Sequence, residues 1–241
     1  MNIVEIRASV ELPSMREDIS FTTQDGITLL GELATPIGKP ARATLLTLHP
    51  LPTHGGFMDS HILRKAANRL PALADIAVLR FNTRGTESPR GKSQGQFDDG
   101  NSEKFDLFAA LEFASSRKLP NIWLVGWSFG TELALKYGVD LDIRGIILLS
   151  PPLHRTSDQE LQLWVGSPKT VVAIVPEFDD YLKPHEAKLR FSMIPQARVV
   201  GVDGAKHLWV GESATSSVLN EIVRAVAPEK APLPTSYELE A

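Results

Sequence analysis

The sequence contains no cysteine among its 241 residues. This absence excludes disulfide bonds, a thiolate nucleophile and any metal site built on cysteine ligands. It is also compatible with a reducing compartment such as the cytoplasm.

Long apolar runs and blocks of like charge are missing too. No stretch approaches the roughly 18 uninterrupted apolar residues of a membrane-spanning helix. Glu5 and Glu11 stand where a signal peptide would need a basic and then an apolar segment. The formal charge of −4 provides no attraction for nucleic acid or for an anionic membrane. We therefore expect a cytoplasmic protein that binds neither nucleic acid nor membranes.

Sequence motifs for metals and nucleotides are absent as well. The chain has no HExxH, no GxGxxG and no GxxxxGK[ST] pattern. We therefore expect no metal and no cofactor. The hydrophobic fraction of 43% and the charged fraction of 22% are typical of a globular protein.

The sequence does contain an alternation of strand-like and helix-like segments. Asp25-Gly26 separates the segments 18–24 and 27–36, which is typical of a hairpin. Strand-like apolar runs and helical patterns then alternate over 43–50, 61–74, 77–82, 102–116, 121–127, 129–138, 143–150, 170–177, 185–194, 197–204 and 216–226. This order predicts an α/β fold: an N-terminal antiparallel hairpin, then a mostly parallel sheet of about eight strands with helices on both faces.

No stretch of the chain has the composition of an interdomain linker. We therefore expect a single domain over residues 1–227, followed by a proline-rich, flexible C-terminal tail over 228–241. Within the helix 61–74, Pro71 is expected to break or kink the backbone.

A GxSxG pattern occurs at the junction of a strand and a helix. Its residues are Gly126, Trp127, Ser128, Phe129 and Gly130; the apolar strand ends at Trp127, and helical periodicity starts directly after Ser128. This strand–turn–helix context is typical of a nucleophile elbow, which exposes the serine hydroxyl at the sheet edge. The competing interpretation is a helix-capping serine in a glycine-flanked turn.

A serine nucleophile needs a general base within hydrogen-bond reach. His185 and His207 follow Ser128 near strand ends. His185 begins a helix and is typical of a solvated first-turn residue. His207 lies in a glycine-containing loop between the last strand and the last helix, so we predict that His207 is the base.

Five stretches of the chain together resemble a known family. They are LHPLPTHGGFMDSHIL, LRFNTRGTESPRGKSQGQFDDGNSEKFD, VGWSFG, VPEFDDYLKP and GAKHLW, within residues 43–212. The chain resembles the α/β-hydrolase superfamily, in particular the small capless serine hydrolases related to dienelactone hydrolases. Dienelactone hydrolases use a cysteine nucleophile, so the resemblance implies the fold and a serine hydrolase rather than their own reaction.

The base needs an orienting carboxylate, which in this superfamily lies between the serine and the histidine in the chain. Asp179 and Asp180 both follow the strand 170–177. Counting from the strand end favours Asp179, whereas counting back from Pro184 with the usual family gap favours Asp180. We prefer Asp179.

Acyl transfer also needs N–H donors for the oxyanion. The family pattern provides one from the residue after the nucleophile, Phe129, and one from the loop after the third strand. In that loop Pro50 and Pro52 lack an N–H, so Leu51 is the expected second donor. His49 is expected to support the loop.

The segment 151–169, where this fold often inserts a lid, holds only about one short helix and a loop. We therefore expect no large cap domain and an open pocket. The residues expected to line this pocket and bind substrate are Trp127, His54, Leu153, His154 and Trp209.

Together these observations predict a serine hydrolase that cleaves a carboxylic ester or thioester of a small to medium substrate, with Ser128, Asp179 and His207 as its triad. The alternative is a catalytically inactive binding or scaffold protein on the same fold, because a fold does not by itself imply a function.

Overall fold

The computed structural model describes residues 2–7 and 9–239 of the chain. Within these residues a central sheet is built from β2 (Met15–Thr22), β3 (Thr28–Thr35), β4 (Ala43–Leu48), β5 (Ile76–Phe81), β8 (Ile122–Trp127), β9 (Gly145–Leu149), β10 (Thr170–Phe178) and β11 (Ala197–Lys206).

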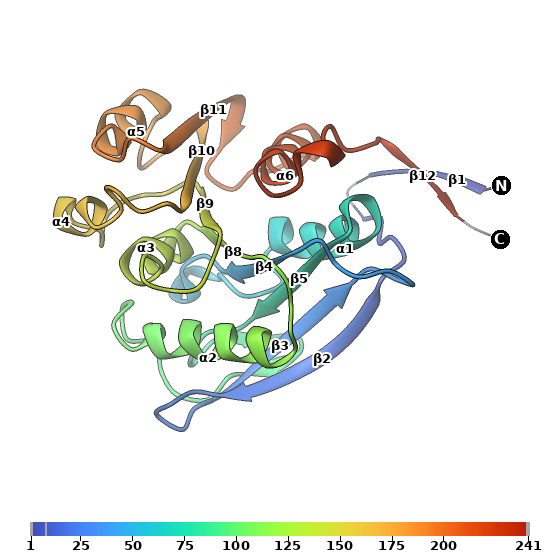
Figure 1. Cartoon of the computed structure of the whole chain (residues 1–241), viewed down its shortest axis with the longest axis horizontal. Helices are drawn as coiled ribbons and strands as arrows, with labels where there is room; N and C mark the ends of the chain where they lie inside the picture. Colours follow the sequence, from blue (N-terminus) through green and yellow to red (C-terminus); the bar gives the residue numbers. More distant parts are fainter. Residues whose placement is uncertain (1, 8, 240–241) are drawn as a thin grey trace.

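The strand order across this sheet is β11-β10-β9-β8-β4-β5-β3-β2 (Figure 1). The pairs β2–β3 and β3–β5 are antiparallel, whereas every other neighbouring pair is parallel. The predicted α/β fold, with an antiparallel hairpin before a mostly parallel sheet, is thus confirmed.

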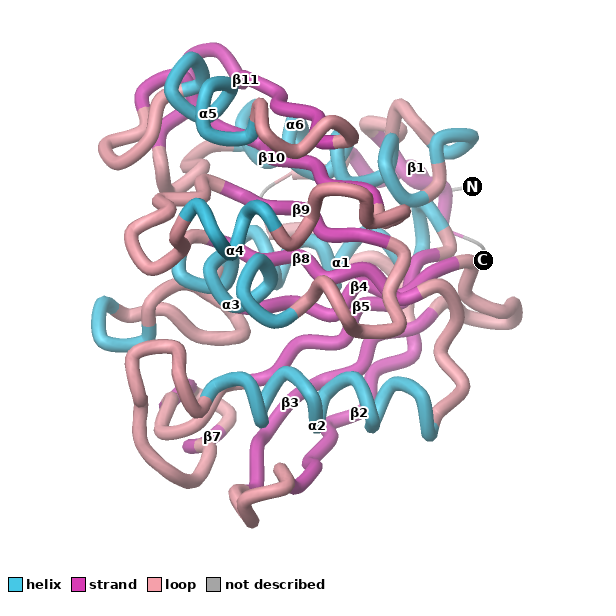
Figure 2. Tube along the Cα trace, turned by 60° about the vertical axis from the view of Figure 1, so that its left-hand side comes forward, coloured by secondary structure: helices cyan, strands magenta, loops and turns pink. Residues whose placement is uncertain are grey.

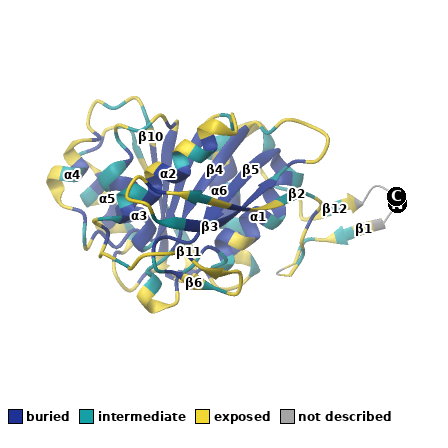
Figure 3. Ribbon diagram, turned by 90° about the horizontal axis from the view of Figure 1, so that it is seen from below, coloured by how far each residue is buried: buried dark blue, intermediate teal, exposed yellow. Residues whose placement is uncertain are grey.

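Helices cover both faces of the sheet (Figure 2). One face packs against α1 (His61–Ala74) and α6 (Glu212–Val226), and the other against α2 (Glu103–Ser116), α3 (Phe129–Tyr137), α4 (Asp158–Gln162) and α5 (Pro184–Phe191). Successive strand residues alternate between the two cores: Leu46 and Leu48 face α3, whereas Leu45 faces α1. The central strands β4, β5, β8 and β9 are therefore buried along their whole length, as the dark blue in Figure 3 shows.

Part of the segment expected to be a flexible tail instead forms secondary structure. β12 (Ser236–Leu239) pairs antiparallel with β1 (Asn2–Glu5), and this ribbon stands away from the body in Figure 3. The Leu233 N–H donates to Asn220 of α6 at 2.7 Å, which ties the segment to the domain. Pairing with the distant N-terminus explains the difference, because a local pattern does not reveal it.

The remaining short elements are the strands β6 (Glu87–Ser88) and β7 (Gly91–Lys92) and the 3₁₀ helices Pro52–His54 and Pro228–Lys230.

Pro71 does not end α1, which continues to Ala74. A proline inside a helix leaves the carbonyl four residues earlier without its usual donor. Here that carbonyl belongs to Ala67, and the Arg16 guanidinium donates to it at 3.2 Å. A side chain from β2 thus replaces the hydrogen bond that Pro71 cannot make.

The connection between β9 and β10 contains only loop and the short helix α4, so the expected absence of a large cap is confirmed. No helix among the described residues is both long and apolar enough to span a membrane.

Candidate active site

Ser128 lies at a sharp turn between β8 and α3. Its backbone is left-handed, with φ 52° and ψ −114°. Glycines allow the close packing that this turn needs: a Cβ at Gly126 would lie 2.4 Å from the Gly130 carbonyl oxygen, and a Cβ at Gly130 would lie 2.1 Å from that of Leu48. The Ser128 hydroxyl does not cap α3, which argues against the interpretation as a capping serine.

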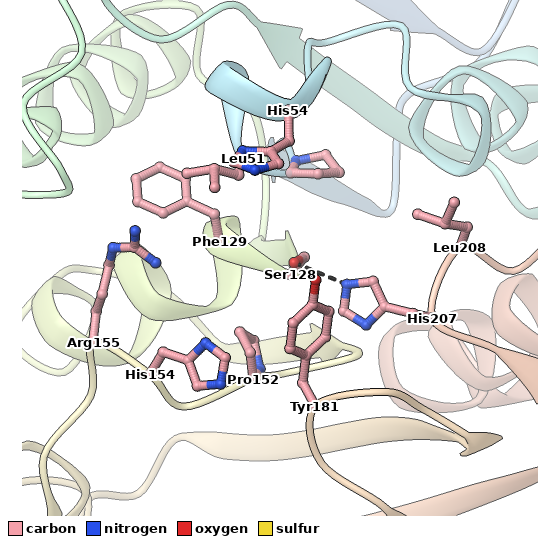
Figure 4. A pocket seen from close by; sticks show the side chains of 11 residues that line it. Leu51, His54, Ser128, Phe129, Pro152, His154, Arg155, Tyr181, His207 and Leu208 are labelled. Carbon is pink, nitrogen blue, oxygen red and sulfur yellow. Dashed lines mark hydrogen bonds between the residues drawn. The ribbon is translucent and has the colours of Figure 1, made fainter.

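A chain of hydrogen bonds connects Ser128 to His207 and Asp179. His207 Nε2 lies 3.0 Å from Ser128 Oγ (Figure 4), and Nδ1 lies 3.0 Å and 3.2 Å from the two Asp179 carboxylate oxygens. A neutral imidazole that donates its Nδ1–H to the carboxylate presents the Nε2 lone pair to the serine hydroxyl. This is the geometry that a serine nucleophile and its base require.

The structure distinguishes between the two candidate aspartates. Asp179 is buried, and its Oδ1 also accepts hydrogen bonds from the backbone N–H groups of Tyr181 (2.9 Å) and Leu182 (3.3 Å). Asp180 is exposed. His185, the other candidate base, is exposed in the first turn of α5. Of the four candidates, only His207 contacts Ser128 and only Asp179 contacts His207.

The backbone around His207 is held by three side chains. Trp127 Nε1 (3.3 Å) and the Ser150 hydroxyl (3.1 Å) donate to the His207 carbonyl oxygen. His61 Nε2, at 2.5 Å, donates to the Leu208 carbonyl. Burial lowers the pKa of His61, which favours its neutral form. No sequence pattern indicates this role of His61, because its partner, Leu208, lies in a loop far along the chain.

The Phe129 N–H is one of the two expected oxyanion donors. It belongs to the first residue of α3, so it has no acceptor within the helix. Its position at the helix N-terminus also favours a developing negative charge. Phe129 lines the same cavity as Ser128 (Figure 4).

The direction of the Leu51 N–H is set through its neighbour. His49 Nδ1 lies 2.7 Å from the Pro50 carbonyl oxygen, to which it donates, while the Thr83 N–H donates to His49 Nε2 at 3.1 Å. The C=O and N–H of one trans peptide point in opposite directions. Holding the Pro50 carbonyl toward His49 therefore turns the Leu51 N–H away from His49. The expected supporting role of His49 thus has a structural basis.

A cavity of about 180 Å³ opens in front of Ser128 (Figure 4). Its walls are formed by Pro50, Leu51, His54, Ser128, Phe129, Pro152, His154, Arg155, Tyr181, His207 and Leu208. His54 and His154 therefore line the cavity, as expected from the sequence. Among the described residues, no group of three or more His, Asp or Glu side chains could hold a metal ion.

Three residues expected to line the pocket lie elsewhere. Trp127, Leu153 and Trp209 are buried in the two hydrophobic cores and do not form the cavity wall. Their closeness to Ser128, Ser150 and His207 in the sequence was misleading, because a strand end or loop turns alternate side chains into the core. Tyr181 and Arg155, which no sequence pattern singled out, form part of the wall instead.

Solved structures of other proteins share this fold. The structure of an α/β serine hydrolase homologue from Coxiella burnetii is 26% identical, with a TM-score of 0.73 over 88% of this chain and 97% of that one. A serine hydrolase without a lid from Xanthomonas campestris is also 26% identical, with a TM-score of 0.74 over 89% and 96%. This chain belongs to the α/β-hydrolase superfamily. Its capless architecture matches the lidless member.

Two further matches are a solved structure of lower identity and a protein that aligns over only part of its length. An esterase from Pyrococcus furiosus shares the fold at 20% identity, with a TM-score of 0.69 over 88% of this chain and 93% of that one. An uncharacterized protein of Rickettsia prowazekii is 33% identical over 129 residues. That match spans 48% of this chain and about half, 51%, of the relative. No protein-family model matches the chain.

The two aspartates after β10 provide a matched pair of variants. We expect Asp179→Asn to lower kcat/KM for hydrolysis by about 10⁴-fold, because an amide at this position favours the wrong tautomer of His207. Asp180→Asn should change it by less than about twofold, because that carboxylate faces solvent. Steady-state kinetics of both folded variants checks this, and a larger loss in Asp180→Asn would reverse the assignment.

His49 gives the α/β-hydrolase a pH-dependent stability. Burial lowers the pKa of His49 from 6.5 to about 4. Between these values the unfolded chain binds a proton at His49 that the folded chain does not, so stability should fall as the pH decreases through this window. The full effect is about 3 kcal/mol. Urea unfolding from pH 7 to pH 4 should therefore show a smaller decline for His49→Asn than for the wild type; parallel curves would contradict this.

Proposed function

We propose that this α/β-hydrolase cleaves a carboxylic ester or thioester of small to medium size through an acyl intermediate on Ser128. The observation that carries the proposal is the hydrogen-bond chain from Ser128 Oγ through His207 to the buried Asp179. A serine hydroxyl is a weak nucleophile unless an adjacent base removes its proton. The arrangement supplies that base and the carboxylate that orients it.

In the acylation step, Ser128 Oγ attacks the substrate carbonyl carbon and its proton passes to His207 Nε2. The Asp179 carboxylate, 3.0 Å from Nδ1, stabilises the imidazolium that forms. The new oxyanion accepts hydrogen bonds from the N–H groups of Phe129 and Leu51. Each such donor lowers the barrier by about 3 kcal/mol.

Collapse of this intermediate completes the first half of the reaction. The His207 imidazolium gives its proton to the leaving oxygen or sulfur, and the acyl group stays on Ser128. His207 then takes a proton from a water molecule that attacks the acyl carbonyl, and the serine receives the proton back. The products are a carboxylic acid and an alcohol or a thiol.

The relatives and the shape of the site support this reaction class. Proteins with the same fold include structures described as a serine hydrolase without a lid and an esterase. The cavity of about 180 Å³ in front of Ser128 suits the reacting end of a small to medium substrate. Because no cap closes over it, longer substrates can extend into solvent while their reacting end occupies the cavity.

The proposal can be tested with 4-nitrophenyl esters and the corresponding thioesters of increasing acyl length. We expect the wild type to hydrolyse the shorter members and Ser128→Ala to lose at least about 10⁴-fold in kcat. The measurement is the release of nitrophenol or thiol, with circular dichroism as the control for folding. Thr131→Ser, which leaves the nucleophile intact, is the control variant.

Two results would contradict the proposal. Equal turnover by the wild type and Ser128→Ala would mean that the reaction does not use Ser128. No turnover of any ester or thioester by folded protein would favour the binding protein on the same fold.

A further inference from the structure

Arg155 is the one lining residue of the cavity with a permanent positive charge, and no Asp or Glu accompanies it among the described residues of the wall. The remaining polar side chains of the wall belong to His54, Ser128, His154, Tyr181 and His207. Its ion-pair partner, Asp99, is not part of the wall, so within the cavity the guanidinium faces no anionic group. An anionic group on the substrate would supply such a partner.

The backbone that carries Arg155 is fixed by a buried carboxylate. Glu132 of α3 is 1% exposed. Its Oε1 accepts the N–H groups of His154 (2.8 Å) and Arg155 (3.1 Å), and its Oε2 accepts the Thr156 hydroxyl. Glu132 lies on the helix that begins after Ser128, so the nucleophile and the arginine loop are attached to one rigid element.

The Arg155 guanidinium has one ion-pair partner but keeps N–H groups that are free to bind a ligand. Its Nε and Nη2 both lie 2.8 Å from a single oxygen, Asp99 Oδ1. Its carbon lies 5.6 Å from the centre of the Phe129 ring. Nη1 makes no hydrogen bond to any described residue. Asp99 is largely exposed, with 66% of its side chain accessible, so solvent weakens the pair. A ligand carboxylate can therefore still bind the free edge.

The position of Arg155 indicates which part of the substrate bears the charge. Figure 4 shows Arg155 and His207 on opposite sides of Ser128, with Phe129 next to the arginine. The leaving group must lie toward His207, which protonates it. The acyl chain therefore extends past Phe129 toward Arg155.

We propose that the preferred acyl group ends in a carboxylate that pairs with Arg155, so that the substrate is a half-ester or half-thioester of an aliphatic dicarboxylic acid. This inference rests on the proposed hydrolysis through Ser128. A guanidinium and a carboxylate match in charge and in planar shape, and hydrogen bonds between them are among the strong ones in proteins. The single free edge suits a monoanionic carboxylate.

The test compares ethyl half-esters of succinic, glutaric, adipic and pimelic acid with the corresponding neutral ethyl ester amides, in which the free carboxylate becomes a carboxamide. At the best chain length we expect the wild type to prefer the carboxylate by about tenfold or more in kcat/KM. The preference should decrease as salt is added. Ethanol release measures both substrates on the same scale.

Matched variants then assign the preference to one residue. Arg155→Gln should bring the ratio of the two kcat/KM values close to one. Asp99→Asn should raise the ratio, because it removes the carboxylate that competes for the guanidinium. Arg190→Gln is the control: Arg190 also pairs with an exposed aspartate, Asp158 at 3.0 Å, but does not line the cavity. It should keep the wild-type ratio.

The outcomes separate this inference from the proposed function. Ser128-dependent hydrolysis with no preference for the carboxylate, or a preference that survives Arg155→Gln, would overturn the inference alone. If no ester is cleaved, binding decides: adipate should raise the melting temperature of the wild type but not of Arg155→Gln. Equal shifts in both proteins would overturn the inference as well.

Discussion

The left-handed backbone of Ser128 is the constraint on which the rest of the site depends. A non-glycine residue in such a conformation costs about 1–3 kcal/mol and persists only where its surroundings enforce it. Here β8 ends and α3 begins on either side of it, and the Ser128 N–H donates to the Leu149 carbonyl of β9 at 2.9 Å. The strain directs the hydroxyl away from the sheet, toward His207. The same turn leaves the Phe129 N–H at the start of α3 free for an oxyanion.

Buried polar groups then hold the two loops that face this turn. On one side, the neutral His49 connects Pro50 to Thr83 and sets the direction of the Leu51 N–H. On the other side, Glu132 binds the backbone of the loop that carries His154 and Arg155. Both groups hold the loop backbone with hydrogen bonds from the protein itself, without any contribution from substrate. Preorganised donors of this kind cost little to reorganise during the reaction.

Much of this arrangement could be predicted from local sequence signals. The alternation of apolar strands with helices predicted the sheet. The GxSxG pattern between a strand and a helix predicted Ser128 as the candidate nucleophile. His207 was identifiable because a loop after the last strand ends at the same sheet edge. The preference for Asp179 over Asp180 rested only on a count from the strand end, and the structure shows that Asp179 is the one that turns inward.

Some pocket residues could not be predicted. Tyr181 and Arg155 were missed, and Trp127, Leu153 and Trp209 were misplaced, because side-chain direction in a loop depends on contacts with distant segments. Arg80 and Glu32 form an ion pair and are almost fully buried. This pair could not be predicted either, because a buried strand is expected to be apolar.

The most direct test of the central claim, that His207 activates Ser128, is the rate of labelling by a fluorophosphonate, followed by intact-mass and peptide mass spectrometry. The account predicts a single adduct on Ser128 of the wild type and at least about a 10³-fold slower reaction in His207→Gln, because the hydroxyl then lacks its base. Labelling at another residue, or an equal rate in the folded His207 variant, would contradict it.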